Sequence, residues 1–338
     1  MRALRTLTCK DVEIASLAGI EKLEDLVHIT FVNTGIAELG PVSNLEGLKS
    51  LHITEDAPEI SGRAGPSHGC GDGVSDLSPL SGLTDLEKLS VICAPVSDLA
   101  PLSGLTRLTE LWIADSQVRG LSGLEDLTSL ESLTVSSSLV SDIAALEELA
   151  NLDSLTLSDN EIDDLSPLSG AAALRNLKIE NNSISDVSAL AGLTNLETLS
   201  LRHNRIVDIS ELPEVENADV SAQEVHLGDL RGGEIRVGDT LANPVRDTGG
   251  RGVALTDPGG EIVADGVEGL KFGKKGEHTA SWDANDGPEP AVTAFDGTLH
   301  ISVLPRFSTV QIAAAIAGAV LVLALATGGA MFWRRRTG

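Results

Sequence analysis

The sequence predicts a solenoid of stacked parallel strands over residues 1–224, an all-β domain after it, and one membrane-spanning helix near the C-terminus. Three observations predict this order: aliphatic residues recur every 22 positions, the pattern then changes to alternation, and an uncharged apolar run follows. The 338 residues are 42% apolar, which is enough for a buried core. The formal net charge of −26 repels nucleic acid, so we expect no nucleic-acid partner.

The repeating unit is defined by its apolar residues. One unit carries them at Val74, Leu77, Leu80, Leu83, Leu86, Leu89 and Val91. Other units open at Ile14, Ile36, Val96, Val118, Val140, Ile162, Ile184 and Ile206. Residues 4–12 match the second half of one more unit, so the sequence holds at least nine. Such a period is typical of a solenoid in which neighbouring units bury each other's apolar side chains.

Each unit is expected to contain one short strand and a tighter return segment. The spacing of Leu199 and Leu201 predicts a strand with both leucines facing inward. The three-residue steps before each strand favour turns or 3-10 helix. Amides stand three places after the later strands, at Asn160, Asn182, Asn204 and Gln223. Because a buried amide can bond to the backbone of a turn, we expect an incomplete amide ladder there.

The units VSDLSPLSGLTDLEKLSVICAP, VSDLAPLSGLTRLTELWIADSQ and ISDVSALAGLTNLETLSLRHNR resemble the 22-residue leucine-rich repeats of bacterial internalins. The resemblance covers roughly two thirds of the chain. It implies an α/β-type horseshoe in which parallel strands alternate with 3-10 or turn returns. It also implies that the concave strand face binds a protein partner, but it says nothing about which partner.

After residue 224 the 22-residue period stops. Residues 225–304 alternate polar and apolar positions, as in Leu299–Val303, between turns such as GG, DPGG and DGP, which predicts an all-β sandwich. Trp282 and Phe295 stand in segments that resemble the late strands of the immunoglobulin-like domain that follows the repeats in internalins. This domain would cap the open end of the solenoid.

A short linker, residues 305–311, leads to the predicted membrane span, residues 312–333. These 22 residues carry no charge and would form a helix of roughly 33 Å, which matches a bilayer core of about 30 Å. A buried core helix is the competing interpretation, but such helices rarely stop at three arginines. Arg334, Arg335 and Arg336 in the tail, residues 334–338, predict that the tail stays in the cytoplasm and the acidic bulk outside.

The start of the chain enters in the middle of a unit and carries no signal peptide. We therefore expect an N-terminal cap and a secretion signal upstream, both missing from this chain. The alternative is a tail-anchored cytosolic protein. Leu304–Ser308 begins like the sortase signal L-P-x-T-G but departs from it at Phe307 and Ser308. Cleavage by a sortase at a degenerate signal is therefore an alternative to a permanent helical anchor.

One of the three cysteines, Cys70, lies inside an insertion of 16 residues, at about residues 57–73, in the unit that opens at Ile36. Cys70 falls 23 residues before Cys93, about one rung away, and neighbouring rungs are close enough for a disulfide. Two free thiols are the competing interpretation. Cys9 occupies an inward strand position and is expected to be a core thiol.

No motif in the sequence indicates catalysis. The seven histidines are scattered, with no HExxH and no G-x-S-x-G. SHGCGDG in the insertion lacks the features of a phosphate loop or a zinc site, and Asp283–Gly287 lacks the closing ligands of a calcium loop. We therefore expect no enzyme activity, no cofactor and no metal.

The residues that point outward from the strands are the candidates for partner binding. Trp112, with Ile92 and Ala114 nearby, forms a small apolar patch that suits an interface anchor. The other candidates are His52 and a charged group, Lys178, Glu180, Arg202 and His203. The competing interpretation is that these are ordinary surface residues.

The sequence thus predicts a single-pass bacterial surface receptor or adhesin of the plasma membrane, with most of the chain extracellular. It would bind a protein through the concave face, with its acidic field steering basic partners. A tail-anchored cytosolic leucine-rich repeat scaffold or regulator is the alternative. The partner could be of host or bacterial origin, or a glycan, and the oligomeric state is open.

Overall fold

A computed structural model describes residues 4–55, 70 and 73–226 of the chain. Beyond these it describes residues 235–236, 240–242, 244–247, 250–251, 253, 255, 262–264, 269–272, 276–283 and 295–304. The predicted linker, membrane span and tail, with Arg334, Arg335 and Arg336, lie outside the described residues, as does most of the insertion. In the part of the chain described here, no helix combines the length and the apolarity that crossing a bilayer requires.

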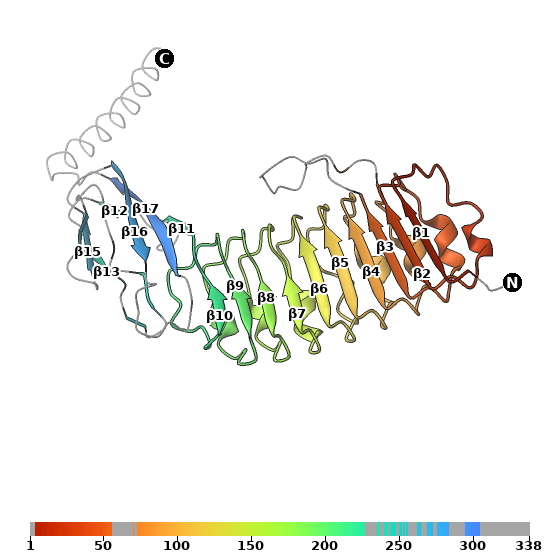
Figure 1. The fold of residues 1–338 in the computed structure, drawn as a ribbon. Coiled ribbons are helices and arrows are strands. Elements are labelled where there is room, and N and C mark those ends of the chain that lie inside the picture. The colour runs from red at the N-terminus through yellow and green to blue at the C-terminus, as the bar shows by residue number, and fades with distance from the viewer. Residues whose placement is uncertain are drawn as a thin grey trace, which may run out of the picture. The chain divides into compact units, whose positions relative to one another are not determined.

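Ten parallel strands form one sheet in which each strand pairs with the next along the chain (Figure 1). They are β1 (Thr6–Lys10), β2 (His28–Val32), β3 (Ser50–Thr54), β4 (Lys88–Ile92), β5 (Glu110–Ala114), β6 (Ser132–Ser136), β7 (Ser154–Thr156), β8 (Asn176–Lys178), β9 (Thr198–Ser200) and β10 (Asn217–Asp219). The register pairs equivalent positions of successive units, as in Leu89 with Leu111. The predicted solenoid of parallel strands is confirmed.

Short 3-10 helices form most of the return segments. They are η1 (Ile20–Lys22), η2 (Gly40–Asn44), η3 (Ser78–Leu80), η4 (Ala100–Leu102), η5 (Ala144–Glu148), η6 (Ser166–Leu168) and η7 (Ser188–Leu190). An aspartate two residues before the helix often accepts from its first N–H, as Asp164 Oδ1 does from Ser166 N at 2.8 Å. The return before β6 has no such helix among its described residues. Gly123 stands there at φ 99°, and a Cβ on it would lie 2.6 Å from Ala100 Cα, so two rungs approach closely at this glycine.

The core is the space between the sheet and the return segments. In each rung the two inward residues, in the strand or directly after it, are buried, as at Leu89 and Val91. The exception is β1, where Leu7 and Cys9 are only half-buried. Cys9 is a free thiol. The half-buried state of Leu7 and Cys9 follows from position, because β1 has a partner strand on one side only among the described strands.

The expected amide ladder is present in the later rungs. Asn182 Oδ1 accepts from Ile162 N of the previous rung at 2.9 Å, and its Nδ2 donates to Leu157 O and Glu180 O. Asn160, Asn204 and Gln223 make the same kind of contacts. In the earlier rungs, the hydroxyls of Ser116 and Ser138 bond to each other instead, at 2.7 Å. The side-chain amides of the ladder donate hydrogen bonds to backbone carbonyl groups. In the rungs that carry these amides the strands have three residues, whereas the earlier strands have five.

One residue just after most strands adopts a left-handed conformation, which turns the chain toward its return path. These residues are Asp11, Asn33, Cys93, Asp115, Ser137, Asp159, Asn181, His203 and Ala222. Asn and Asp tolerate this conformation better than most residues, which explains their frequency here. Glu55 holds the equivalent place at the start of the insertion, and its Oε1 instead accepts from Thr34 N and Gly35 N.

Seven further strands follow the array. They are β11 (Gln223–His226), β12 (Ile235–Arg236), β13 (Thr240–Ala242), β14 (Ile262–Ala264), β15 (Gly269–Phe272), β16 (Gly276–Asp283) and β17 (Asp296–Leu304). One sheet has the order β11-β17-β12, with β16 also paired to β17, and the other has the order β13-β15-β14.

The chain divides into two compact units. The first contains Met1–Val225, Pro244–Thr256 and Ser281–Leu299, and the second contains the described residues among 226–243, 257–280 and 300–304. Trp282 and Phe295 are buried in the first unit, with ring centroids 5.8 Å apart. The compact unit that holds the repeats therefore also takes in two segments from beyond residue 224.

Candidate protein-binding surface

The outward side chains of β1–β10 form a continuous surface, which we call the strand face. Because the sheet is parallel and in register, equivalent residues line up in rows across the strands. The middle row contains Thr8, Thr30, His52, Ser90, Trp112, Thr134, Thr156, Lys178, Ser200 and Asp219. Each side chain of β2–β9 in this row therefore has known neighbours on both sides.

Trp112 is the large exposed hydrophobic side chain of the strand face, with 50% of its surface accessible. Its neighbours Leu111 and Ile113 point into the core and are buried, so the backbone that carries Trp112 is fixed. Ile92, half-buried, lies diagonally across on β4, whereas Ala114 is only 7% exposed. Of the predicted apolar patch, Trp112 and Ile92 are therefore accessible and Ala114 is largely covered.

His52 lies two strands away from Trp112 in the same row. Its Nε2 lies 2.8 Å from Thr54 Oγ1 on the same strand, which holds the ring in place. Burial, and then repulsion from Lys10, lowers the pKa of His52 below its ordinary value. The ring is therefore neutral at neutral pH and can contact an uncharged group.

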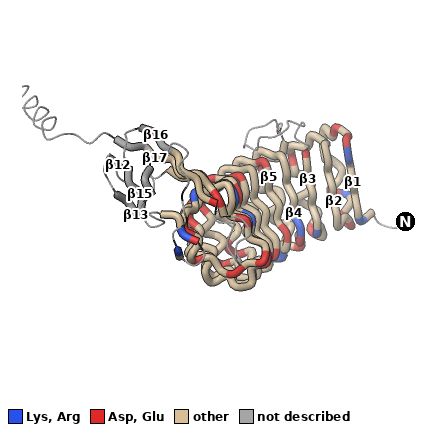
Figure 2. The backbone as a smooth tube through the Cα atoms, turned by 60° about the vertical axis from the view of Figure 1, so that its left-hand side comes forward, with Lys and Arg blue, Asp and Glu red and all other residues tan. Residues whose placement is uncertain are grey.

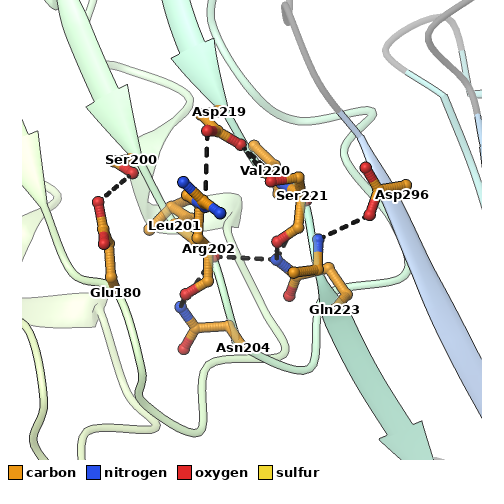
Figure 3. Close-up of polar contacts among 11 residues, drawn as sticks. Glu180, Ser200, Leu201, Arg202, Asn204, Asp219, Val220, Ser221, Gln223 and Asp296 are labelled. Carbon is orange, nitrogen blue, oxygen red and sulfur yellow. Dashed lines mark hydrogen bonds and ion pairs between the residues drawn. The ribbon is translucent and has the colours of Figure 1, made fainter. Parts of the chain in front are cut away.

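The predicted charged group lies at the end of β8 and on the turns after β8 and β9. Figure 3 shows the contacts of two of its members, Glu180 and Arg202. Ser200 Oγ donates to Glu180 Oε1 at 2.6 Å, and Arg202 Nε lies 3.7 Å from Asp219 Oδ2. Lys178 and His203 are exposed, and His203 occupies the left-handed turn position. The structure thus brings these residues onto neighbouring rungs, with Glu180 and Arg202 engaged by contacts within the protein.

Charge is unevenly distributed between the strand face and the rest of the array. The outward positions, in the strands or two places after the short strands β8 and β9, hold few charges. The basic residues there are Lys10, Lys88, Lys178 and Arg202, and the acidic ones are Glu110, Glu180 and Asp219. Most acidic residues of the array lie instead on the return segments (Figure 2). The strand face is therefore nearly neutral within a chain of net charge −26.

Asp115 and Asp159 have unusual environments that the sequence did not single out. Both stand at the left-handed turn at the end of a strand and are half-buried. Burial raises the pKa of both carboxyl groups, and for Asp159 the nearby negative charge of Glu180 raises it further. Their fixed position, three residues after the middle-row residues Trp112 and Thr156, was the available signal.

The end of the insertion is tied to the sheet. Cys70 and Cys93 form a disulfide with Cα atoms 5.0 Å apart, and Cys93 is buried directly after β4. Among the described residues, no group of three or more His, Cys, Asp or Glu side chains could hold a metal ion.

Comparison with known proteins agrees with this geometry. A family model for leucine-rich repeats in two copies matches residues 172–214. Internalin C2 from Listeria monocytogenes is 29% identical, with a TM-score of 0.50, over 56% of this chain and 77% of that protein. The chain is an internalin-like leucine-rich repeat protein.

A second internalin extends the likeness in fold. InlP from Listeria monocytogenes is only 15% identical to this internalin-like protein, but the likeness covers 90% of this chain and 88% of InlP, with a TM-score of 0.60. No curated protein matches the chain. The repeat architecture is thus shared with internalins.

Proposed function

We propose that this internalin-like protein is a bacterial surface receptor or adhesin that binds a protein partner through its strand face. The observation that carries the proposal is the half-exposed Trp112 in the middle row of the sheet, on a strand whose inward side chains, Leu111 and Ile113, are buried. Exposed tryptophans on rigid surfaces are typical anchors of protein interfaces. Because the backbone around Trp112 is already ordered, a partner binds without the entropic cost of ordering it.

The proposal includes the predicted placement at the membrane. An immunoglobulin-like spacer within residues 225–304, a membrane span at residues 312–333 and the tail with Arg334, Arg335 and Arg336 would hold the repeats outside the cell. The Cys70–Cys93 disulfide supports this side of the membrane, because disulfides persist in oxidising compartments and are rare in the cytosol. It therefore weighs against the cytosolic scaffold.

The test is the effect of Trp112→Ala on binding. The full chain in detergent micelles is used to isolate a partner from surface extracts, and the affinity for the purified partner is then measured. We expect Trp112→Ala to weaken binding at least about tenfold, as the loss of an interface anchor does. Thr156→Ala, in the same row two strands away, is the matched control and should change affinity little. Unchanged affinity in Trp112→Ala would refute the proposal.

A further inference from the structure

Ser90 is the smallest of three consecutive residues in the middle row of the strand face. Strand β4 lies between β3 and β5 (Figure 1). The register places Ser90 of β4 opposite His52 of β3 on one side and opposite Trp112 of β5 on the other. Neighbouring strands lie about 4.8 Å apart, so the two ring-bearing residues are separated by roughly 10 Å. A small side chain thus stands between two larger ones, and we call these three residues the aromatic slot.

The floor of the aromatic slot carries an unused hydrogen-bonding group. Ser90 Oγ is buried and has no hydrogen-bond partner, a condition shared among the described residues only by Trp282 Nε1. A buried hydroxyl without a partner lowers the stability of the fold, so its presence calls for an explanation. A ligand group that enters the slot and bonds to this hydroxyl would supply one.

The walls of the aromatic slot differ in mobility. The His52 ring is held by the 2.8 Å contact between its Nε2 and Thr54 Oγ1. Trp112 is half exposed, so its side chain can rotate at little cost in packing. Because Ser90 Oγ is covered in this structure, a ligand can reach it only after a neighbouring side chain moves, and the half-exposed Trp112 is the wall with the freedom to do so.

We infer that the aromatic slot, as part of the partner-binding surface proposed above, receives a tyrosine side chain of the protein partner. A ring placed midway would lie about 5 Å from each wall, within the 4.5–7 Å range of stacked aromatic rings. Its hydroxyl, which both donates and accepts, would bond to Ser90 Oγ. The near-neutral strand face suits an uncharged ring.

A glycan fits the same site less well. A sugar ring carries several hydroxyl groups, and each of them needs a partner when it leaves water. The aromatic slot offers one unpaired hydroxyl, and the apolar side chain of Ile92 lies beside it. The single unpaired hydroxyl group of Ser90 therefore matches the single hydroxyl group of a tyrosine ring.

The test uses fluorine NMR of the full chain, labelled with fluorotryptophan, in detergent micelles. The Trp112 signal is assigned from its loss in Trp112→Phe, and N-acetyltyrosinamide and N-acetylphenylalaninamide are then titrated. We expect the tyrosine probe to bind about fivefold more tightly than the phenylalanine probe, the worth of one hydrogen bond. Ser90→Ala should remove this preference and leave the affinity for phenylalanine unchanged.

Thr134→Val is the matched control, because it removes a hydroxyl on the other side of Trp112 and should keep the preference. Equal affinities in the unmodified protein, a preference retained in Ser90→Ala, or a Trp112 signal that never shifts would overturn the inference. Saturation of the Trp112 signal by glucose, and not by the tyrosine probe, would indicate a glycan and also overturn it. If Trp112→Ala still abolishes partner binding in any of these cases, the proposed function stands while the tyrosine assignment fails.

Discussion

At the scale of single residues, buried polar groups decide how the rungs are joined. Each ladder amide accepts from the backbone of the previous rung and donates to carbonyls of two rungs, so it replaces backbone bonds that the tight turn cannot make. The amides therefore act between rungs as well as within them. We therefore expect the amide position to affect the stability of the array, although its side chain does not lie on the strand face.

Asn204→Ala tests the ladder. Asn204 is only 2% exposed and its side chain bonds to Ile184 N, Ile179 O and Leu201 O. We expect a loss of about 2–4 kcal/mol in the free energy of unfolding, because the change leaves buried backbone groups without partners. Urea denaturation measures it. Asn151→Ala, which removes one exposed bond to Thr128 O, is the control and should cost less than about 1 kcal/mol.

Asp159→Asn tests the cost of a half-buried charge. Burial and the charge of Glu180 raise the folded-state pKa above the ordinary 3.8, so the wild type loses stability as pH rises through this raised pKa. Asparagine avoids that loss and tolerates the left-handed conformation that Asn181 adopts in the next rung. We expect a gain of ~0.5–1 kcal/mol at pH 7 that disappears below pH 3.8. Urea denaturation across this pH range would contradict the idea if the gain were constant.

At the scale of elements, each rung depends on its neighbours. A strand and its 3-10 return bury their aliphatic side chains against the neighbouring rungs. The inward residues of β1, which has a partner strand on one side only among the described strands, remain partly exposed. The strand face inherits its rigidity from this stacking. Among the described rungs, we therefore expect the lowest local stability at β1.

Leu155→Ala and Leu7→Ala compare a central with a terminal rung. Leu155 of β7 is fully buried, so its truncation should cost about 2–5 kcal/mol. Leu7 of β1 is already partly exposed, and the same change there should cost only about 1 kcal/mol. Hydrogen exchange and urea denaturation of both variants measure the difference. Equal costs would contradict the dependence on neighbouring rungs.

At the scale of the whole molecule, the sidedness of the membrane distinguishes the proposed receptor from a cytosolic scaffold. We expect protease added to intact cells that make this protein naturally to digest the repeats, and a variant without residues 312–338 to appear in the medium. Immunoblotting of cells and medium measures both. Repeats that stay protected until the cells are lysed would contradict the extracellular placement.

The amino-acid sequence by itself was sufficient to predict the repeat, the inward residues and the 3-10 returns. The physical reason is that every unit buries aliphatic side chains at the same positions, as at Leu89 and Val91. The 22-residue spacing of these residues is therefore visible in the sequence itself. The outward residues are free of that constraint, and sequence reasoning overestimated Ala114, which the structure largely covers.

Only the tertiary structure decided which outward residues meet. His52 and Trp112 are 60 positions apart and are separated by the insertion, yet the strand register places them on either side of Ser90. The buried state of Ser90 Oγ and the raised pKa of Asp159 likewise depend on neighbours from other rungs. Contacts of this kind arise from the stacking of rungs, so no single unit of the sequence contains them.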